Sequence, residues 1–270
     1  MKAGDNDKTM PGQPRNMGAA EMKLMSIFMD WIKGGGIISP RILDFGCGIG
    51  NYSRIFAEYG YTVTAVEIDH ESLKYLKGQD TSGSIIAICG DITTEIFKEG
   101  VLYDVIIISE VMEHLDRPQE VLQIVGRHLS DNGFAIFTIP NGYGPWEIYN
   151  RIASRPLLHK IIYAPFYFPI YIKNLLSKQN VQIIRKKRIH CTMNSDSPHI
   201  HFWTFNKFLA LLKEYGFKMR EVRNSNISYK WMPYYYRIKN SKLDFIDVKV
   251  ADYLPHFMVS GWIFKVSKNR

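Results

Sequence analysis

One stretch organises the chain: Arg41-Ile-Leu-Asp-Phe-Gly-Cys-Gly-Ile-Gly50. Apolar residues on both sides of Asp44 are typical of a parallel strand that is buried on both faces. Gly46, Gly48 and Gly50 predict a sharp turn that comes close to a ligand, because a Cβ would block either the dihedral angles or the approach. Residues 51–59 have the pattern of a helix. We therefore expect a strand, a ligand-binding turn and a helix.

The glycine spacing separates two kinds of nucleotide site. A dinucleotide fingerprint, G-x-G-x-x-G, would need a third glycine at position 51, where the chain has Asn51. An acid followed by three alternate glycines instead resembles the first motif of the class I S-adenosylmethionine-dependent methyltransferases. The resemblance implies that S-adenosyl-L-methionine is the cofactor. It also implies that cofactor-binding residues lie at Asp44, Gly46, Cys47, Gly48 and Gly50.

Further apolar runs alternate with helical patterns and predict a doubly wound α/β sheet. The segments expected to be strands are 41–45, 62–69, 84–92, 103–111, 134–140, 217–222 and 261–267, with a turn at 130–133. The resemblance implies a Rossmann-like, mostly parallel seven-stranded sheet, with helices on both faces and an antiparallel last strand. We expect a single methyltransferase domain over 19–270, beginning with a helix at 19–33.

Acids at the ends of successive strands should share one rim of the sheet. Glu67 is expected to accept both ribose hydroxyls, beside Ile68, while Asp69 caps the next helix. The resemblance implies that Asp91 and Ile92 contact the adenine; the alternative is that Asp91 starts a turn. Ser109, at the end of the fourth strand, is a further expected cofactor contact.

The run Ser109-Glu-Val-Met-Glu-His-Leu115 bears on the chemistry. The spacing i, i+3, i+4 would put Glu110, Glu113 and His114 on one side of a helical turn. Two oxygens and one nitrogen suit Mg²⁺ or Mn²⁺. The run resembles the metal motif of the ubiquinone-biosynthesis O-methyltransferases and of the small-RNA 2′-O-methyltransferases. Alternatively, Glu113 and His114 cap or orient the helix, and His114 acts alone as a base.

A second pair of histidines precedes the helix expected at 204–216. His199 stands where related methyltransferases have a histidine, and His201 alternates onto the same face if the segment is extended. Either residue could complete a metal shell or deprotonate the acceptor. The expected catalytic residues are therefore Glu113, His114 and His199.

Two segments, 141–200 and 227–258, match no known pattern and are expected to form a lid or cap over the acceptor. The apolar stretch 156–173 could instead rest on a membrane or form a hairpin in a dimer. The basic run 185–188 is either a solvated face or a contact for phosphate or anionic lipid. The aromatic residues Trp231 and 234–236 are either a substrate wall or core.

Composition sets wider limits. A formal charge of +8 indicates either an anionic partner or a merely basic surface. Cys47, Cys89 and Cys191 have no paired spacing, which is typical of reduced intracellular thiols. Residues 1–18 are expected to be a disordered tail, and they lack the apolar core of a signal peptide. We therefore expect a cytoplasmic protein, with peripheral contact to a membrane or an anionic substrate through 156–188.

The resemblance implies a methyltransferase that acts on oxygen in a hydroxylated small molecule, and the apolar insertion favours an acceptor with an apolar portion. The first alternative is methylation of a sugar, a glycan or an RNA end, although no nucleic-acid-binding module is recognised. From a different class, the chain could be a non-catalytic module that binds S-adenosylmethionine.

Overall fold

The computed structural model describes residues 17–94, 100–153, 199–227 and 241–269, together with 155, 157, 161 and 164. Several predictions lie outside these residues. They are the tail at 1–16, nearly all of the apolar and basic insertion at 154–198, the thiol of Cys191, and the aromatic residues at 228–240. At the edge of the expected tail, Gly18 precedes the first helix, and its amide donates a hydrogen bond to Glu21 Oε2.

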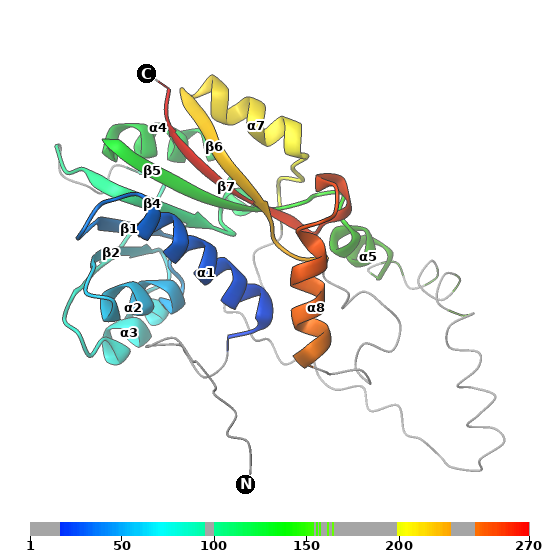
Figure 1. Ribbon diagram of the computed structural model, residues 1–270, viewed down its shortest axis with the longest axis horizontal. Helices are drawn as coiled ribbons and strands as arrows, with labels where there is room; N and C mark the ends of the chain where they lie inside the picture. Colours follow the sequence, from blue (N-terminus) through cyan, green and yellow to red (C-terminus); the bar gives the residue numbers. More distant parts are fainter. Residues whose placement is uncertain are drawn as a thin grey trace, which may run out of the picture.

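Seven strands form one sheet in the order β3-β2-β1-β4-β5-β7-β6 (Figure 1). The strands are β1 Arg41–Phe45, β2 Thr62–Glu67, β3 Ile85–Cys89, β4 Tyr103–Ser109, β5 Leu129–Pro140, β6 Phe217–Asn224 and β7 Gly261–Lys268. Strands β1 to β5 pair in parallel, whereas β7 is antiparallel to both β5 and β6. This topology confirms the predicted fold class, including the antiparallel last strand.

The turn expected at 130–133 is wrong, because these residues belong to β5. The pairing of β4 with β5 shifts register between Tyr103 and Val105, which gives β5 an irregularity instead of a separate turn. The side chain of Asp104 lies at this point. Its Oδ1 accepts a hydrogen bond from Ser130 Oγ, and its Oδ2 accepts one from the amide of Arg41. A polar side chain thus bridges the strands where the ladder is interrupted.

Helices cover both faces of the sheet. They are α1 Ala19–Gly34, α2 Asn51–Glu58, α3 His70–Gln79, α4 Pro118–His128, α5 Pro145–Ala153, α7 Phe205–Glu214 and α8 Ser241–Ala251. Alternate residues of each strand face opposite sides, so the core divides in two. One cluster joins α1 and α2 to Ile42 and Ile107, and the other joins α4 and α7 to Leu43 and Ile106. Figure 1 shows α1 crossing in front of the strands.

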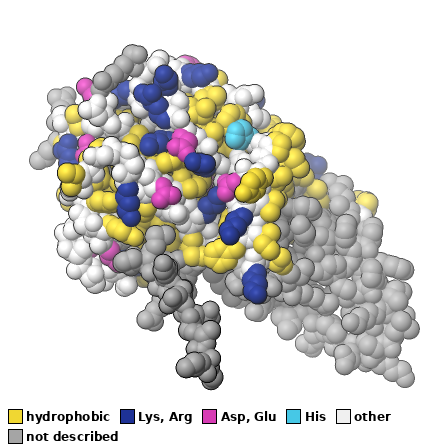
Figure 2. Space-filling model, viewed as in Figure 1, with side chains coloured by type: hydrophobic (Ala, Val, Ile, Leu, Met, Phe, Trp, Pro, Cys, Tyr) yellow, Lys and Arg dark blue, Asp and Glu magenta, His cyan; other side chains and the backbone are white. Residues whose placement is uncertain are grey.

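Helix α8 lies against α1, within the segment that we expected to be a cap. Lys23 Nζ donates hydrogen bonds to the backbone oxygen of Val248 at 2.6 Å and to Asp252 Oδ1 at 2.7 Å. Hydrophobic side chains gather along the exposed side of α8, among them Phe245 and Ile246 (Figure 2). Within the described part of the chain, no helix is both long and apolar enough to cross a bilayer.

Candidate active site

The glycine turn after β1 has the backbone that the sequence predicts. Gly46, Gly48 and Gly50 have φ angles of 68°, 53° and 75°, a region that favours glycine. A Cβ on Gly46 would come within 2.6 Å of Val111 Cγ2, and one on Gly50 within 2.3 Å of Leu76 Cδ1. A Cβ on Gly48 would meet no atom of the described residues within 4 Å. The backbone thus favours glycine at all three positions, a Cβ at two of them would also displace a neighbouring side chain, and the space at Gly48 is open.

Asp44 lies beneath this turn. Its carboxylate is buried, and its Oδ2 accepts a hydrogen bond of 2.5 Å from Ser53 Oγ on α2. Burial raises the pKa of Asp44 to about 6, and the nearby charge of Glu67 acts in the same direction. The neighbouring Cys47 has a free thiol whose pKa burial also raises, so it stays protonated. The position of Asp44 links the turn to the first residues of α2.

Glu67 ends β2 beside the same turn. Its Oε2 accepts a hydrogen bond from the amide of Gly48 at 2.9 Å. Its Oε1 accepts from the amides of Ile68 at 2.9 Å and Asp69 at 3.1 Å. Because each carboxylate oxygen has two lone pairs, these three bonds leave room on Oε2 for one further donor. The backbone thus fixes the carboxylate beside the glycine turn, and its contact with the ribose stays a prediction. The Ile68 side chain is exposed.

Asp91 has the geometry of the alternative that the sequence left open. Its Oδ1 accepts hydrogen bonds from both the amide and the hydroxyl of Thr93, each at 2.8 Å, which is a turn stabilised by the side chain. Ile92 is buried and packs in the core cluster of α4 and α7. Contact of either residue with the adenine stays a prediction.

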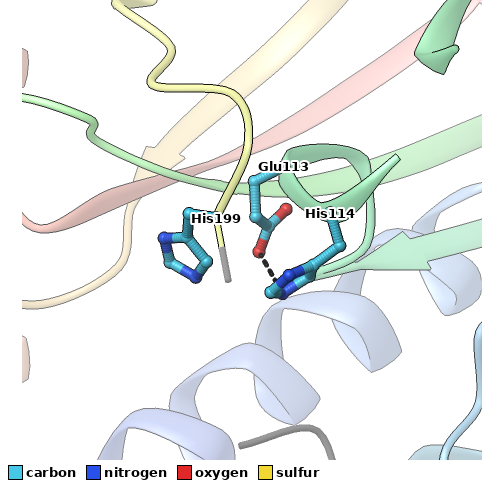
Figure 3. Close-up of side chains that lie close together, drawn as sticks. All are labelled: Glu113, His114 and His199. Atoms are coloured by element: carbon cyan, nitrogen blue, oxygen red, sulfur yellow. Dashed lines mark ion pairs between the residues drawn. The ribbon is translucent and has the colours of Figure 1, made fainter. Parts of the chain in front are cut away.

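A second group of side chains lies around the short helix η1, Met112–His114. One possible ligand atom from each of Glu113, His114 and His199 lies within 4.8 Å of the others (Figure 3). The amides of Ile200 and His201 donate to the backbone oxygen of Glu113 at 2.8 and 3.1 Å, and so bring the distant segment to η1. The structure thus unites the three predicted catalytic residues.

Glu113 is the most unusual member of this cluster. Its side chain is fully buried, and neither carboxylate oxygen has a hydrogen-bond partner among the described residues. His114 Nε2 lies 3.7 Å from Glu113 Oε1. Burial raises the pKa of Glu113 well above its ordinary value, and the charge of Glu110 adds to the effect. A buried carboxylate without a donor is costly, so a proton or a cation would stabilise it.

Glu110 does not join the cluster in the way the spacing predicts. Its φ of 55° is left-handed, so Glu110, Glu113 and His114 do not share a helical turn, and that prediction is wrong. Thr138 Oγ1 donates to Glu110 Oε1 at 2.9 Å and also lies 2.9 Å from Ser109 Oγ. His199 takes the third position. The compact donor set therefore has one oxygen and two nitrogens instead of the reverse.

The two histidines of the second segment have different surroundings. The rings of His199 and His114 meet edge to face with centroids 4.9 Å apart. The ring of His201 instead stacks on Trp203 at 5.1 Å. Both the 200 and 201 amides bond to one carbonyl, so the backbone is not extended here. The expectation that His201 shares a face with His199 is therefore not met.

Glu147 is a member of the site that the sequence did not predict. It lies in α5, its side chain is buried, and its Oε1 is 3.0 Å from Nδ1 of His199. This close, negatively charged carboxylate raises the pKa of His199. A single glutamate in an amphipathic helix carries no signal in the sequence. Only the folded chain places it behind an imidazole.

Comparison with known proteins adds to this geometry. The model of the family described as "Methyltransferase domain" matches residues 28–222. A ubiquinone biosynthesis O-methyltransferase from Rickettsia typhi is 28% identical over 155 residues, which cover 53% of this chain and 60% of the relative. The alignment thus spans less than two thirds of that relative.

Solved structures support the fold. A SAM-dependent methyltransferase from Archaeoglobus fulgidus aligns over 92% of this chain and 94% of its own, at 14% identity and a TM-score of 0.54. An S-adenosylmethionine-dependent methyltransferase from Clostridium acetobutylicum aligns over 92% of each chain, at 12% identity and a TM-score of 0.55. At these identities the likeness concerns the fold alone.

Proposed function

The chain belongs to the methyltransferase domain family, and from this premise we propose that it methylates a hydroxyl oxygen of a small molecule with an apolar portion. It is an S-adenosylmethionine-dependent methyltransferase, with the Rossmann-like sheet of that class. Relatives named ubiquinone biosynthesis O-methyltransferases support oxygen as the acceptor atom. The observation that carries the proposal is the cluster of Glu113, His114 and His199.

The two parts of the site have different roles. The glycine turn and Glu67 hold the cofactor, so that its sulfonium methyl group can meet the acceptor in line. As the new carbon–oxygen bond forms, the carbon–sulfur bond breaks, its electron pair returns to sulfur, and S-adenosylhomocysteine leaves. The acceptor hydroxyl must lose its proton. The imidazoles of His114 and His199 are able to take it.

The same cluster fits a divalent cation. The buried carboxylate of Glu113 has no donor among the described residues, and two imidazoles lie beside it. Glu113, His114 and His199 would hold the ion. One oxygen and two nitrogens favour Mn²⁺ or another first-row transition metal over Mg²⁺, which prefers oxygen ligands. A bound cation would lower the pKa of the acceptor hydroxyl.

Exposed apolar side chains that are close in sequence to the cluster support an acceptor with an apolar portion. Ile148 follows Glu147 on α5, and Ile200 follows His199; each is about half exposed, at 48%. Phe202, from the same segment, is 39% exposed. Exposed apolar side chains next to a polar cluster are typical of ligand sites, where apolar walls surround a few polar groups.

Transfer of a labelled methyl group tests the proposal. Pairs of hydroxylated aromatic compounds, with and without an apolar tail, are incubated with the protein and labelled cofactor. We expect the label on oxygen, with faster transfer to the tailed member of each pair. Glu113→Gln should reduce the rate at least roughly 100-fold. Its affinity for S-adenosylhomocysteine, measured by calorimetry, should be unchanged. Label on nitrogen, or an unaffected variant, contradicts the proposal.

The charge of +8 favours a second candidate, methylation of an anionic sugar, a glycan or an RNA end. Such an acceptor would make the rate fall steeply with added salt, because phosphate binding releases counterions. A neutral acceptor with an apolar tail would lack this strong dependence. Cofactor binding without transfer to any acceptor class would instead indicate a binding module.

A further inference from the structure

Glu147 and His199 form a buried pair behind the proposed catalytic cluster. The Glu147 side chain is only 5% exposed, and its Oε1 lies 3.0 Å from Nδ1 of His199. The other edge of the His199 ring faces Glu113 and His114 (Figure 3). Glu147 therefore reaches the ring from behind, where it would contact neither acceptor nor cofactor.

We propose that Glu147 is a positioning residue, which holds Nδ1–H of His199 so that Nε2 presents its lone pair to Glu113 and His114. The inference rests on the proposed function of that cluster. An ionised carboxylate can only accept hydrogen bonds, so it selects the tautomer with the proton on Nδ1. Selection of the tautomer and of the ring orientation makes Nε2 a defined ligand or base.

Two glycines in the backbone before α5 allow it to pack closely against neighbouring segments. Gly142 N donates to the backbone oxygen of Trp203 at 2.9 Å, and a Cβ on Gly142 would lie 2.5 Å from the backbone of Phe202. A Cβ on Gly144 would lie 2.7 Å from the backbone oxygen of Val259. Only glycine fits at these two positions without a shift of the neighbouring backbone. The close approach at Gly142 brings the residues just before α5, and with them Glu147, near the segment that carries His199.

Burial also argues for a specific partner. An unpaired carboxylate removed from water is strongly destabilising, so a buried glutamate needs a donor. His199 Nδ1, 3.0 Å away, is its ion-pair partner in the described structure, although the N–H is not aligned on Oε1 as a hydrogen bond. A glutamate that only filled space in α5 could be replaced by an apolar side chain at a gain in stability. An apolar replacement would, however, remove the carboxylate oxygen that lies beside the imidazole of His199.

Glu147→Gln keeps the volume and removes the charge, and its amide can either donate to Nδ1 or accept from it. We expect two results for this variant. The affinity for Mn²⁺, measured by calorimetry, falls roughly 10- to 100-fold. In metal-free protein with ¹⁵N-labelled histidine, at a pH where the ring is neutral, the spectrum of His199 changes from one tautomer to a mixture. The affinity for S-adenosylhomocysteine stays the same.

Glu214→Gln is the matched control, because it makes the same change at an exposed position of another helix, α7. It should leave all three measurements unchanged. If Glu147→Gln loses its cooperative melting transition, Glu147→Asp replaces it: the charge stays, but the carboxylate is one methylene further from Nδ1. Unchanged Mn²⁺ affinity together with an unchanged tautomer would overturn the role of Glu147.

Failure of the proposed function has a different signature. If the wild-type protein binds S-adenosylhomocysteine but transfers no methyl group to any hydroxylated acceptor, the function fails while the tautomer measurement still judges Glu147. If the wild-type protein binds no Mn²⁺, the tautomer of His199 in the ¹⁵N spectrum is the measurement that tests the role of Glu147. A single Nδ1–H tautomer that depends on Glu147 supports the inference, and a mixture in the wild type refutes it.

Discussion

Replacing Asp44 by Asn should stabilise the folded protein at neutral pH. Burial raises the pKa of Asp44 from its ordinary value of 3.8 to about 6, so the folded state resists ionisation of this group. Because one pKa unit corresponds to about 1.36 kcal/mol, the wild type loses about 3 kcal/mol of unfolding free energy as pH rises from below 4 to above 6. An Asn cannot ionise, and its side-chain oxygen can still accept from Ser53 Oγ.

The pH dependence separates this effect from any constant effect of the substitution. Urea unfolding, followed by circular dichroism at pH 5.0, 6.0 and 7.5, measures the difference in unfolding free energy between Asp44→Asn and wild type. The difference should grow by about 1 kcal/mol over this range, since part of the change occurs below pH 5. Asp131→Asn, at an exposed acid on β5, should show no such growth. A difference independent of pH would refute a raised pKa for Asp44.

Two further predictions concern the cofactor half of the site. Glu67→Gln should weaken the binding of S-adenosylhomocysteine at least roughly 10-fold by calorimetry, because hydrogen bonds to a charged carboxylate contribute about 1.5 to 3 kcal/mol; unchanged affinity would remove Glu67 from the ribose site. Gly50→Ala should lower the unfolding free energy by about 2 to 4 kcal/mol, because it combines a φ of 75° with an approach of 2.3 Å to Leu76 Cδ1. The control Gly60→Ala has a φ of 83° but meets no atom of the described residues within 4 Å, so it should cost only about 1 to 2 kcal/mol, and an equal loss would exclude the clash.

The elements that the sequence predicted well depend on short-range patterns. The alternation of apolar runs and helices is a local property, and the crossover rule turns it into one sheet with a shared rim. The glycine turn follows from the spacing of its glycines, whereas the antiparallel last strand was implied by the resemblance to the methyltransferases. Even here, the irregularity in β5 was missed; the side chain of Asp104, in another strand, bonds to Ser130 at this point.

Local sequence patterns did not predict the arrangement of the proposed catalytic cluster. The spacing of Glu110, Glu113 and His114 puts them on one side only if the backbone is helical from its first residue. Glu110 has a left-handed φ, because its amide and carboxylate both bond to Thr138 on β5. The sequence indicated His199 by its position in the resembled family. It had no signal for Glu147, whose buried contact depends on the packing of α5.

The sequence by itself thus determined the α/β fold class and the glycine turn, since each depends on residues close together in the chain, and its resemblance to the methyltransferases implied the cofactor. Only the tertiary structure decided which side chains meet at the reacting end. The cluster draws on η1, α5 and the segment before α7, and no local pattern sets the distance between elements so far apart in sequence. The sequence predicted a site with two carboxylates and one imidazole. The packing of these elements instead gives one buried carboxylate, two imidazoles and a glutamate beside one of them.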